Sequence, residues 1–292
     1  MKKICVIVNP SSGQSIQVVP QISKFLKDNT YSWEVFTTKK QGDALQFSRQ
    51  AINNEADAVL VYGGDGTVME ASGALMNTNT PLYILPGGTA NILAKELQIP
   101  LFLEPALGLL KDSHSKIRRI DMGTVNGHPF ILRVSTGVLA DMIIEADPEA
   151  KTNFGQLAYS FSALQQFANT KSIEYSITIN GQTEVIEGIT LTVANSGNIG
   201  FSGLSFSPEI KVDDGYLDII VLRDNTFGSI AGVITDAIIN RDLNDDLAHR
   251  RVKKAKISIK PPQSVLCDDI LLNEVTLDIE VIPSAISVAV PL

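Results

Sequence analysis

The sequence has few cysteines, few histidines and no long apolar run. Its two cysteines, Cys5 and Cys267, lie far apart in strand-like segments, so they do not form the framework of a disulfide-rich domain, and a cytoplasmic location is expected. The three histidines are scattered singly, which argues against a zinc site or a histidine-based triad. No apolar run approaches the ~20 residues of a membrane-spanning helix, so we expect any membrane contact to be peripheral.

Basic residues are also in the minority. The 24 Lys and Arg against 32 Asp and Glu give a formal net charge of -8. Nucleic-acid binding needs a basic surface that displaces counterions, so this balance argues against a nucleic-acid partner. Two local basic segments, residues 116–119 and 250–256, fit either a solvated face or a contact with anionic lipid headgroups.

The first hundred residues repeat a strand-then-helix pattern four times. Apolar strands are predicted at residues 4–8, 33–37, 57–62 and 82–85, with helices at 16–26, 44–52, from about 65 to 76, and at 90–97. Asp43 is the expected N-cap of the second helix. This alternation predicts a parallel sheet covered by helices, with ligands at the carboxyl ends of its strands.

Beyond Pro100 the pattern changes to strands separated by tight turns, after one more helix at 104–111. Asn126-Gly127 and Asn180-Gly181 are strong hairpin signals. The predicted strands are 116–125, 129–135, 174–179, 183–193, 216–222, 252–259, 264–267, 276–282 and 285–290, with helices at 154–167 and 228–239. A β-rich second domain of residues 121–292 is therefore expected after a first domain of residues 1–120, and a return of the extreme C-terminus to the first domain is left open. The apolar stripe of the 154–167 helix fits core packing better than a lipid pocket.

Three polar or glycine-rich loops follow strands of the first domain, at residues 9–13, 63–67 and 87–89. Loops that follow parallel strands converge at one sheet edge, where backbone N–H groups and the hydroxyls of Thr67 and Thr89 suit phosphate oxygens. Asp65, among glycines, suits a metal or a hydroxyl. Neither standard phosphate-binding fingerprint is present, so a simple tight turn at 63–67 is the alternative interpretation.

Seven motifs carry a resemblance that covers essentially the whole chain. They are VNPSSG (8–13), TTKKQGDA (37–44), GGDGTVME (63–70), LPGGTANILA (85–94), ANSGNIGFSGLSFSP (194–208), KVDDGYLD (211–218) and VIPSAISVAVP (281–291). In this order the sequence resembles the bacterial diacylglycerol kinase and sphingosine kinase catalytic-domain family of lipid kinases. The resemblance implies an α/β nucleotide-binding domain, similar to those of NAD kinases and phosphofructokinases, followed by a β-rich sandwich domain that takes the lipid.

The resemblance also implies an ATP site and a magnesium site. It places ATP against residues of several loops: Asn9, Pro10, Ser11, Ser12, Gly13, Thr38, Gly64, Asp65, Gly66, Thr67, Val68, Met69, Glu70 and Thr89. In KVDDGYLD it places a structural Mg²⁺ on the Asp214 carboxylate and the carbonyl groups of Lys211 and Tyr216. Oxygen ligands suit such a hard cation, and a plain β-turn is the alternative.

The sequence departs from the family pattern at three positions. Ile92 stands where many members have aspartate, Met69 replaces a common asparagine, and Ile270 falls on the glutamate usually assigned as proton acceptor. Isoleucine cannot accept a proton. Asp268 keeps the family's aspartate and is our candidate for the remaining acid–base or orienting role, with Asp65 as the second catalytic candidate. Asp269 and Glu274 are nearby substitutes for Asp268.

The sequence therefore predicts an ATP- and Mg²⁺-dependent kinase that transfers the γ-phosphoryl group to a lipid hydroxyl, and the resemblance implies a homodimer. Two alternatives remain. One is a nucleotide- or lipid-binding protein of the same fold with reduced or lost kinase activity, which Ile270 and Ile92 favour. The other is a kinase of a soluble substrate such as NAD, which the KVDDGYLD segment and the C-terminal motif disfavour.

Overall fold

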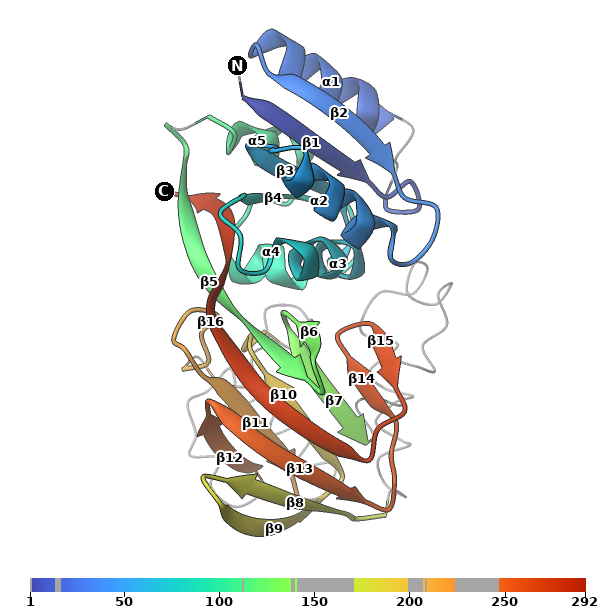
Figure 1. Ribbon diagram of the computed structural model, residues 1–292, viewed down its shortest axis with the longest axis vertical. Helices are drawn as coiled ribbons and strands as arrows, with labels where there is room; N and C mark the ends of the chain where they lie inside the picture. Colours follow the sequence, from blue (N-terminus) through green and yellow to red (C-terminus); the bar gives the residue numbers. More distant parts are fainter. Residues whose placement is uncertain are drawn as a thin grey trace. The chain divides into compact units, whose positions relative to one another are not determined.

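The computed structural model describes residues 2–13, 17–111, 113–137, 140, 171–198, 207, 209–223 and 247–292 (Figure 1). The chain divides into two compact units, which we call unit 1 (Met1–Ile120 with Ser284–Leu292) and unit 2 (Asp121–Pro283). Two strands, β5 (Ser115–Val125) and β16 (Thr276–Pro291), contribute residues to both units. The helices predicted at 154–167 and 228–239 lie outside the described residues.

Unit 1 alternates strands and helices, as the sequence predicts. Its further elements are β1 (Lys3–Val8), α1 (Val18–Asp28), β2 (Ser32–Thr37), α2 (Asp43–Asn53), β3 (Ala58–Gly63), α3 (Asp65–Leu75), β4 (Leu82–Pro86), α4 (Ile92–Glu96) and α5 (Leu103–Gly108). The strand order is β2-β1-β3-β4-β16, and each of these pairings is parallel. The predicted parallel sheet is confirmed.

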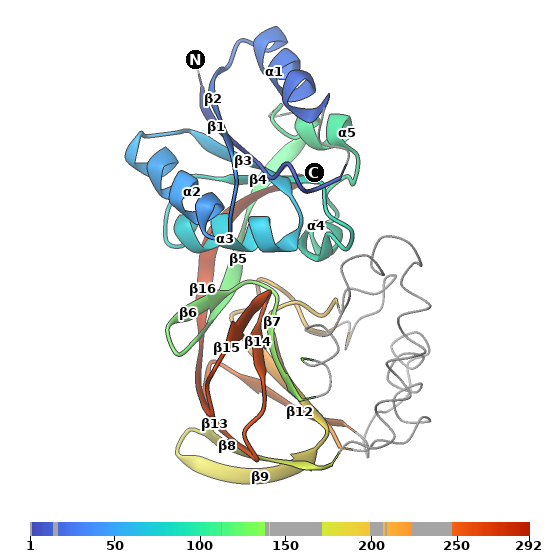
Figure 2. The ribbon, with the colours of Figure 1, turned by 90° about the vertical axis from the view of Figure 1, so that its right-hand side faces the viewer.

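Helices cover both faces of this sheet. Figure 2 shows α2 and α3 on one face and α1 and α5 on the other. All six residues of β3 and all five of β4 are buried, which explains why these strands are continuously apolar rather than alternating. In α1 the buried residues are Val18, Ile22 and Leu26, one stripe at a spacing of four, so this helix presents a single apolar face to the sheet.

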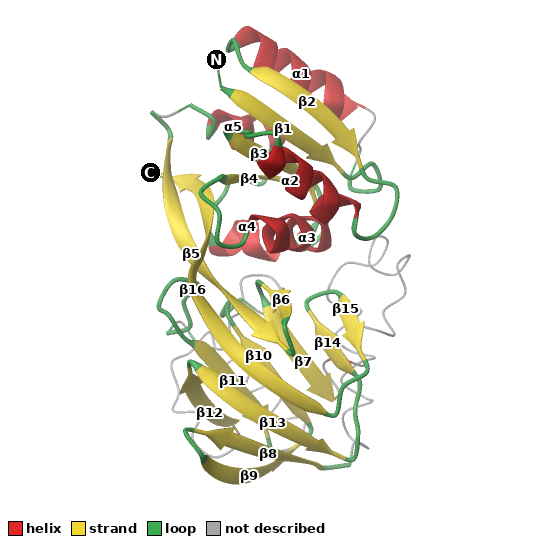
Figure 3. Ribbon diagram, in the orientation of Figure 1, coloured by secondary structure: helices red, strands yellow, loops and turns green. Residues whose placement is uncertain are grey.

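Unit 2 is built from antiparallel strands (Figure 3). Its elements are β6 (His128–Phe130), β7 (Arg133–Gly137), β8 (Ile173–Ile179), β9 (Gln182–Gly188), β10 (Thr190–Ala194), β11 (Leu217–Leu222), β12 (Leu247–Val252), β13 (Lys254–Lys260), β14 (Val265–Cys267) and β15 (Ile270–Leu272). One sheet runs β12-β11-β10-β7-β14-β15, and the other orders β16, β13, β8 and β9. Apolar side chains of both sheets, such as Leu191, Ile219, Tyr175 and Ile257, form one buried core, which confirms the predicted β-sandwich.

Several predicted strand boundaries are wrong. The single strand predicted at 183–193 is two strands, β9 and β10, which lie in different sheets. The chain changes sheets at Gly188, where a Cβ would lie 2.5 Å from the carbonyl oxygen of Leu222. Conversely, the two strands predicted at 276–282 and 285–290 form the single strand β16. The strand predicted at 129–135 is divided into β6 and β7. The strand predicted at 252–259 corresponds to β13 and overlaps β12 only at Val252, so most of β12 and all of β15 have no predicted counterpart.

Gly123 in β5 provides a test of core packing in unit 2. It pairs with Phe130 of β6, whose ring is fully buried, and a Cβ at position 123 would overlap that ring. We predict that Gly123→Ala lowers the free energy of unfolding by about 1–3 kcal/mol, measured by urea denaturation. Gly108→Ala in α5 is the control, because a Cβ there meets nothing within 4 Å, and it should raise that free energy by about 0.4–1 kcal/mol. Equal losses in both variants would contradict the packing argument.

Candidate active site

Four loops of unit 1 lie side by side at the carboxyl ends of β2, β1, β3 and β4. At each junction a backbone hydrogen bond runs from the first residue after one strand to a residue at the end of the neighbouring strand. The three bonds run from Thr38 N–H to the Val8 carbonyl, from Asn9 N–H to the Tyr62 carbonyl and from Gly87 N–H to the Gly63 carbonyl, each 2.9 Å long. The loops therefore converge at one edge of the sheet, as their positions after parallel strands predict.

The side chain of Asn9 joins the first of these loops to helix α3. Its Nδ2 donates to Thr67 Oγ1 at 3.0 Å, and its Oδ1 accepts the N–H of Ser11 at 3.0 Å. Ser12 is buried, whereas Pro10 and Ser11 are exposed and Gly13 has a φ of 60°. The loop thus forms a compact turn at the surface, with its anchor on Thr67.

The two glycine-rich loops touch backbone to backbone. A Cβ at Gly88 would lie 2.5 Å from the Cα of Gly64, and one at Gly87 would lie 2.7 Å from Cζ of Tyr62. Glycine is therefore required at both positions for this approach. The sequence pattern predicts Tyr62 only as a strand residue, and nothing in that pattern indicates that its ring lies against Gly87. Burial raises the pKa of the Tyr62 hydroxyl.

Asp65 links the third loop to the fourth. Its Oδ1 accepts the N–H groups of Ile92 at 2.7 Å and Leu93 at 3.3 Å, at the start of α4. Asn91, with a φ of 48°, accepts the N–H of Gly88 at 3.0 Å and donates to its carbonyl at 2.7 Å. The side chain of Ile92, where the family pattern has aspartate, is buried. The Asp65 carboxylate therefore binds the backbone at the start of α4.

Two carboxylates hold the loop between β2 and α2. Glu70 of α3 accepts the N–H of Gly42 at 2.8 Å through Oε1 and that of Ala44 at 3.2 Å through Oε2. Glu70 is thus fully engaged with the backbone of a neighbouring loop, although the resemblance places it against ATP.

Asp43 is not the N-cap that the sequence predicts. Gly42, with a φ of 89°, takes that position, and Asp43 is the first residue of α2. Its Oδ2 accepts the N–H groups of Lys39 at 2.8 Å and Lys40 at 3.1 Å. These hydrogen bonds lower the pKa of the Asp43 carboxyl, and the bond from Lys39 has the largest effect. The Asp43 carboxylate therefore binds the loop that precedes α2 rather than the first turn of the helix.

The remaining residues of the predicted ATP site differ in their exposure. Val68 and Met69 are buried in α3, so their side chains belong to the core of unit 1. Met69 is apolar where the family pattern has asparagine, and its burial explains why an apolar residue is accommodated there. Thr89 is exposed, and Gly64 and Gly66 are partly exposed.

Asp268, in unit 2, holds the backbone of residues 131–133. Its carboxylate accepts the N–H groups of Ile131 at 2.8 Å, Leu132 at 3.1 Å and Arg133 at 2.8 Å. Asp268 has a φ of 48°, which turns its side chain toward this segment, and its own N–H donates to the Arg133 carbonyl at 2.8 Å. Although the residue as a whole is only partly buried, burial of the carboxyl group raises its pKa to about 6, against the lowering effect of the three N–H groups.

The neighbours of Asp268 do not gather around it as an acidic cluster. Ile270 packs against the core of unit 2 from β15, while Asp269 is exposed and Glu274 is partly exposed. Position 270 therefore carries an apolar side chain on an apolar surface. A glutamate at this place would have to turn away from the core.

The KVDDGYLD segment of unit 2 forms a turn that leads into β11. Asp214 Oδ1 accepts the N–H of Tyr216 at 3.0 Å, and Gly215 has a φ of 76°. Asp214 Oδ2 lies 2.6 Å from Nη2 of Arg251. Lys211 is exposed. In the described part of the chain, no group of three or more His, Cys, Asp or Glu side chains is arranged to hold a metal ion.

Two family models match the chain in succession. Residues 3–125 match the diacylglycerol kinase catalytic domain, and residues 133–290 match the YegS C-terminal NAD kinase beta sandwich-like domain. A diacylglycerol kinase of Bacillus subtilis is 27% identical over 278 residues, which are 92% of this chain and 89% of the relative.

Solved structures show the same fold. Two crystal structures from Bacillus anthracis each cover 98% of this chain and are themselves covered to 96%. The first has a TM-score of 0.83 at 26% identity, and the second, of a diacylglycerol kinase, has a TM-score of 0.75 at 24% identity. Among the residues that the structure describes, no helix has the length and hydropathy that a membrane crossing requires.

The Asp268 carboxyl should make stability depend on pH. Its folded pKa of about 6 exceeds the ordinary value of 3.8, so the folded protein binds a proton in this interval that the unfolded chain does not. Its stabilising contribution is complete below the ordinary value and is lost as pH rises through about 6. We predict that the difference in unfolding free energy between wild type and Asp268→Asn shifts against the wild type as pH rises from ~4 to ~6. A difference that is constant over this range in chemical denaturation would contradict the assignment.

The carboxylates of Glu70 and Asp43, which both hold the β2–α2 loop, should protect different backbone N–H groups from hydrogen exchange. Glu70→Gln leaves one acceptor oxygen for two N–H groups, so we predict about tenfold faster hydrogen exchange at Gly42 or Ala44. Asp43→Asn is the comparison variant. Both N–H groups share Oδ2, so the loss of negative charge weakens their acceptor and should speed exchange at Lys39 and Lys40 instead. Amide-resolved exchange measured by NMR distinguishes the two patterns. Identical patterns in both variants would mean that the loop opens as one body.

Proposed function

Because the chain belongs to the diacylglycerol kinase catalytic-domain family of lipid kinases, we propose that it uses ATP and Mg²⁺ to transfer a γ-phosphoryl group to the hydroxyl of a diacylglycerol-like lipid. The observation that carries the proposal is the row of loops at the carboxyl ends of β2, β1, β3 and β4, joined by backbone hydrogen bonds. Helix α3 begins within this row, at Asp65, and the N–H groups of a helix's first turn suit the phosphate oxygens of a nucleotide.

In this proposal the chain contributes mainly positioning. Phosphoryl transfer needs little covalent chemistry from the protein, and its rate depends on in-line placement and on neutralised charge. The Asn9 turn is held by the hydrogen bonds of its own side chain and Gly64 lies against Gly88, so in this proposal the loops present a pre-organised surface to the phosphates. Asp65 is the carboxylate at this edge that would face a bound Mg²⁺, which would supply charge neutralisation when present.

We assign Asp268 an orienting role. Its carboxylate fixes three consecutive N–H groups of residues 131–133, and this arrangement pre-organises the segment. The three N–H groups engage both carboxylate oxygens, which favours the orienting role over that of a proton acceptor.

A nucleotide- and lipid-binding protein without turnover is the second candidate. The packing of Ile270 against the core of unit 2 favours it, because the position assigned to the family's proton acceptor carries an apolar side chain. A positioned base is worth roughly 10²–10⁴-fold in rate, so its loss would leave binding intact while slowing the reaction.

The basic segment 250–256 gives weak support to a membrane role. Arg250 makes two hydrogen bonds of 2.7 Å to Glu184, Arg251 pairs with Asp214, and Lys254 lies 3.3 Å from Glu280. Because these positive charges already have acidic partners within unit 2, we propose that the segment is a solvated face and that any lipid contact lies elsewhere.

The activity is tested with labelled ATP, Mg²⁺ and diacylglycerol in mixed micelles, with NAD as the soluble alternative acceptor. We predict a phosphorylated lipid and no phosphorylated NAD. Gly88→Ala should lower kcat/KM by about 10²-fold, because its Cβ would lie 2.5 Å from the Cα of Gly64 and displace the phosphate loops. Gly108→Ala, whose Cβ meets nothing within 4 Å, is the matched control and should keep full activity.

The outcomes separate the candidates. Nucleotide binding by calorimetry without lipid product, together with a gain of activity in Ile270→Glu, would establish the second candidate. Phosphorylated NAD, or neither binding nor product, would overturn the lipid kinase proposal.

A further inference from the structure

The KVDDGYLD turn lies in a strongly acidic part of unit 2. Asp121 and Asp218 are 2% and 3% exposed, and the side chain of Asp214 is 14% exposed. Buried carboxylates of this kind are stable only with hydrogen bonds and a compensating positive charge. The family resemblance supplies that charge with Mg²⁺ on Asp214.

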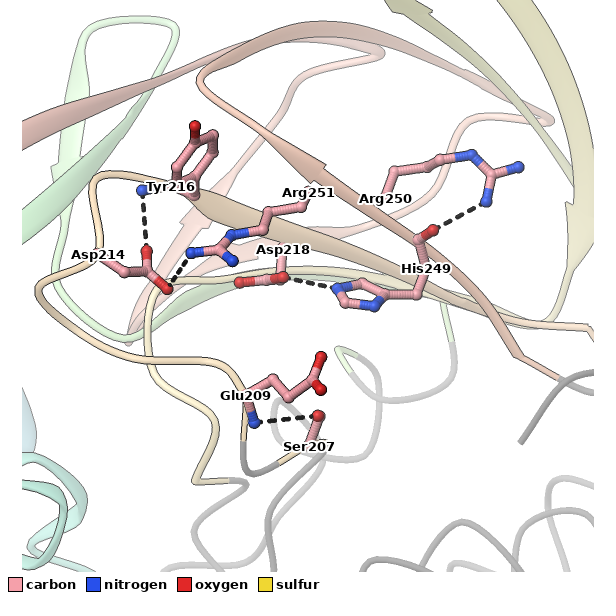
Figure 4. Close-up of polar contacts among 8 residues, drawn as sticks. All are labelled: Ser207, Glu209, Asp214, Tyr216, Asp218, His249, Arg250 and Arg251. Atoms are coloured by element: carbon pink, nitrogen blue, oxygen red, sulfur yellow. Dashed lines mark hydrogen bonds and ion pairs between the residues drawn. The ribbon is translucent and has the colours of Figure 1, made fainter. Parts of the chain in front are cut away.

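Arg251 of β12 already provides a positive charge at this carboxylate. Its Nη2 lies 2.6 Å from Asp214 Oδ2, in an ion pair rather than a well-directed hydrogen bond. The guanidinium carbon also lies 4.4 Å from the centre of the Tyr216 ring. Figure 4 shows the guanidinium group directed at the Asp214 carboxylate, beside Tyr216. Because an ion pair and an aromatic ring both hold it, the Arg251 side chain is already ordered in this position.

The other two carboxylates have partners of their own. Asp121 Oδ2 accepts the N–H of Gly215 at 2.6 Å, and Asp218 Oδ1 lies 2.6 Å from Nε2 of His249. Asp214 Oδ1 accepts the N–H of Tyr216, so both of its oxygens have contacts within the protein.

The hollow next to Asp214 has a volume of about 430 Å³, and among the described residues it is lined by Glu209, Lys211, Asp214 and Arg251. These lining residues carry both signs of charge. A divalent cation here would be repelled by a guanidinium group that lies against the same carboxylate. With Arg251 in this position, the Asp214 carboxylate does not fit the magnesium site that the resemblance predicts on Lys211, Asp214 and Tyr216.

We propose that Arg251 is the resident cation of the Asp214 turn and takes the place of Mg²⁺, so that the stability of unit 2 does not depend on a divalent cation. The positive charge comes from β12, whose register places Arg251 opposite Asp218 of β11. The turn before β11 is thereby fastened to the neighbouring strand of the same sheet. The inference concerns stability and does not rest on the proposed kinase activity.

The test is thermal unfolding of the nucleotide-free full chain, in chelator and in excess Mg²⁺. The wild type should unfold at the same midpoint in both. Arg251→Met should lower the midpoint in chelator by at least about 3 °C, and Mg²⁺ should restore it, since a cation can then reach Asp214. Lys253→Met is the matched control, because Lys253 lies 5.2 Å from the centre of the same Tyr216 ring and should leave the midpoint without a response to Mg²⁺.

Two results would overturn the proposal. One is a wild-type midpoint that rises in Mg²⁺ and loses this rise in Asp214→Asn. The other is an Arg251→Met chain that is destabilised and that Mg²⁺ does not restore. If Arg251→Met does not fold, Mn²⁺ binding to wild type and Asp214→Asn is compared by electron paramagnetic resonance. Equal stoichiometry supports the proposal, and one site fewer in Asp214→Asn overturns it.

Discussion

The contact between Gly64 and Gly88 is the constraint on which the candidate site depends. Two loops can approach at backbone distance only where neither carries a side chain, and a single Cβ at Gly88 would lie 2.5 Å from the Cα of Gly64. This approach brings the N-terminus of α4 within reach of Asp65, whose Oδ1 then accepts two of its N–H groups. Because α4 has only five residues, it has few bonds of its own, and this carboxylate replaces the partners that its first turn lacks.

Four acidic residues share one use. Asp65, Glu70 and Asp268 each accept two or more backbone N–H groups from a segment distant in sequence, and Asp43 accepts two from the loop just before it. A carboxylate that accepts several N–H groups fixes a loop more firmly than a neutral acceptor would, since bonds to charged groups are stronger. The described contacts of these four acids are therefore with backbone segments that they hold in place.

The sequence predicts the fold well where strand periodicity and turn chemistry agree. The four strand–helix units of unit 1 and the two Asn-Gly hairpins follow from local pattern, and Asn126 and Asn180 both have the positive φ that their turns require, at 49° and 51°. Prediction fails where the outcome depends on distant partners. At Gly188, where the chain changes sheets, a side chain is excluded by the Leu222 carbonyl. The Tyr62 ring lies against Gly87, which is 25 positions later in the chain. The partners of Asp43 and Glu70 are likewise invisible in a pattern of single residues.

The departures from the family pattern have a common physical cause. Ile92 and Met69 are buried in unit 1, and Ile270 packs against the core of unit 2, so each apolar residue adds burial where the pattern has a polar group. Burying such a side chain contributes roughly 1.5–3 kcal/mol, whereas a polar group there would need a hydrogen-bond partner. In our proposal the guanidinium group of Arg251 likewise replaces, at the Asp214 carboxylate, a cation that would otherwise come from solution. At these described positions the protein meets its needs from within, by apolar burial or by an internal ion pair.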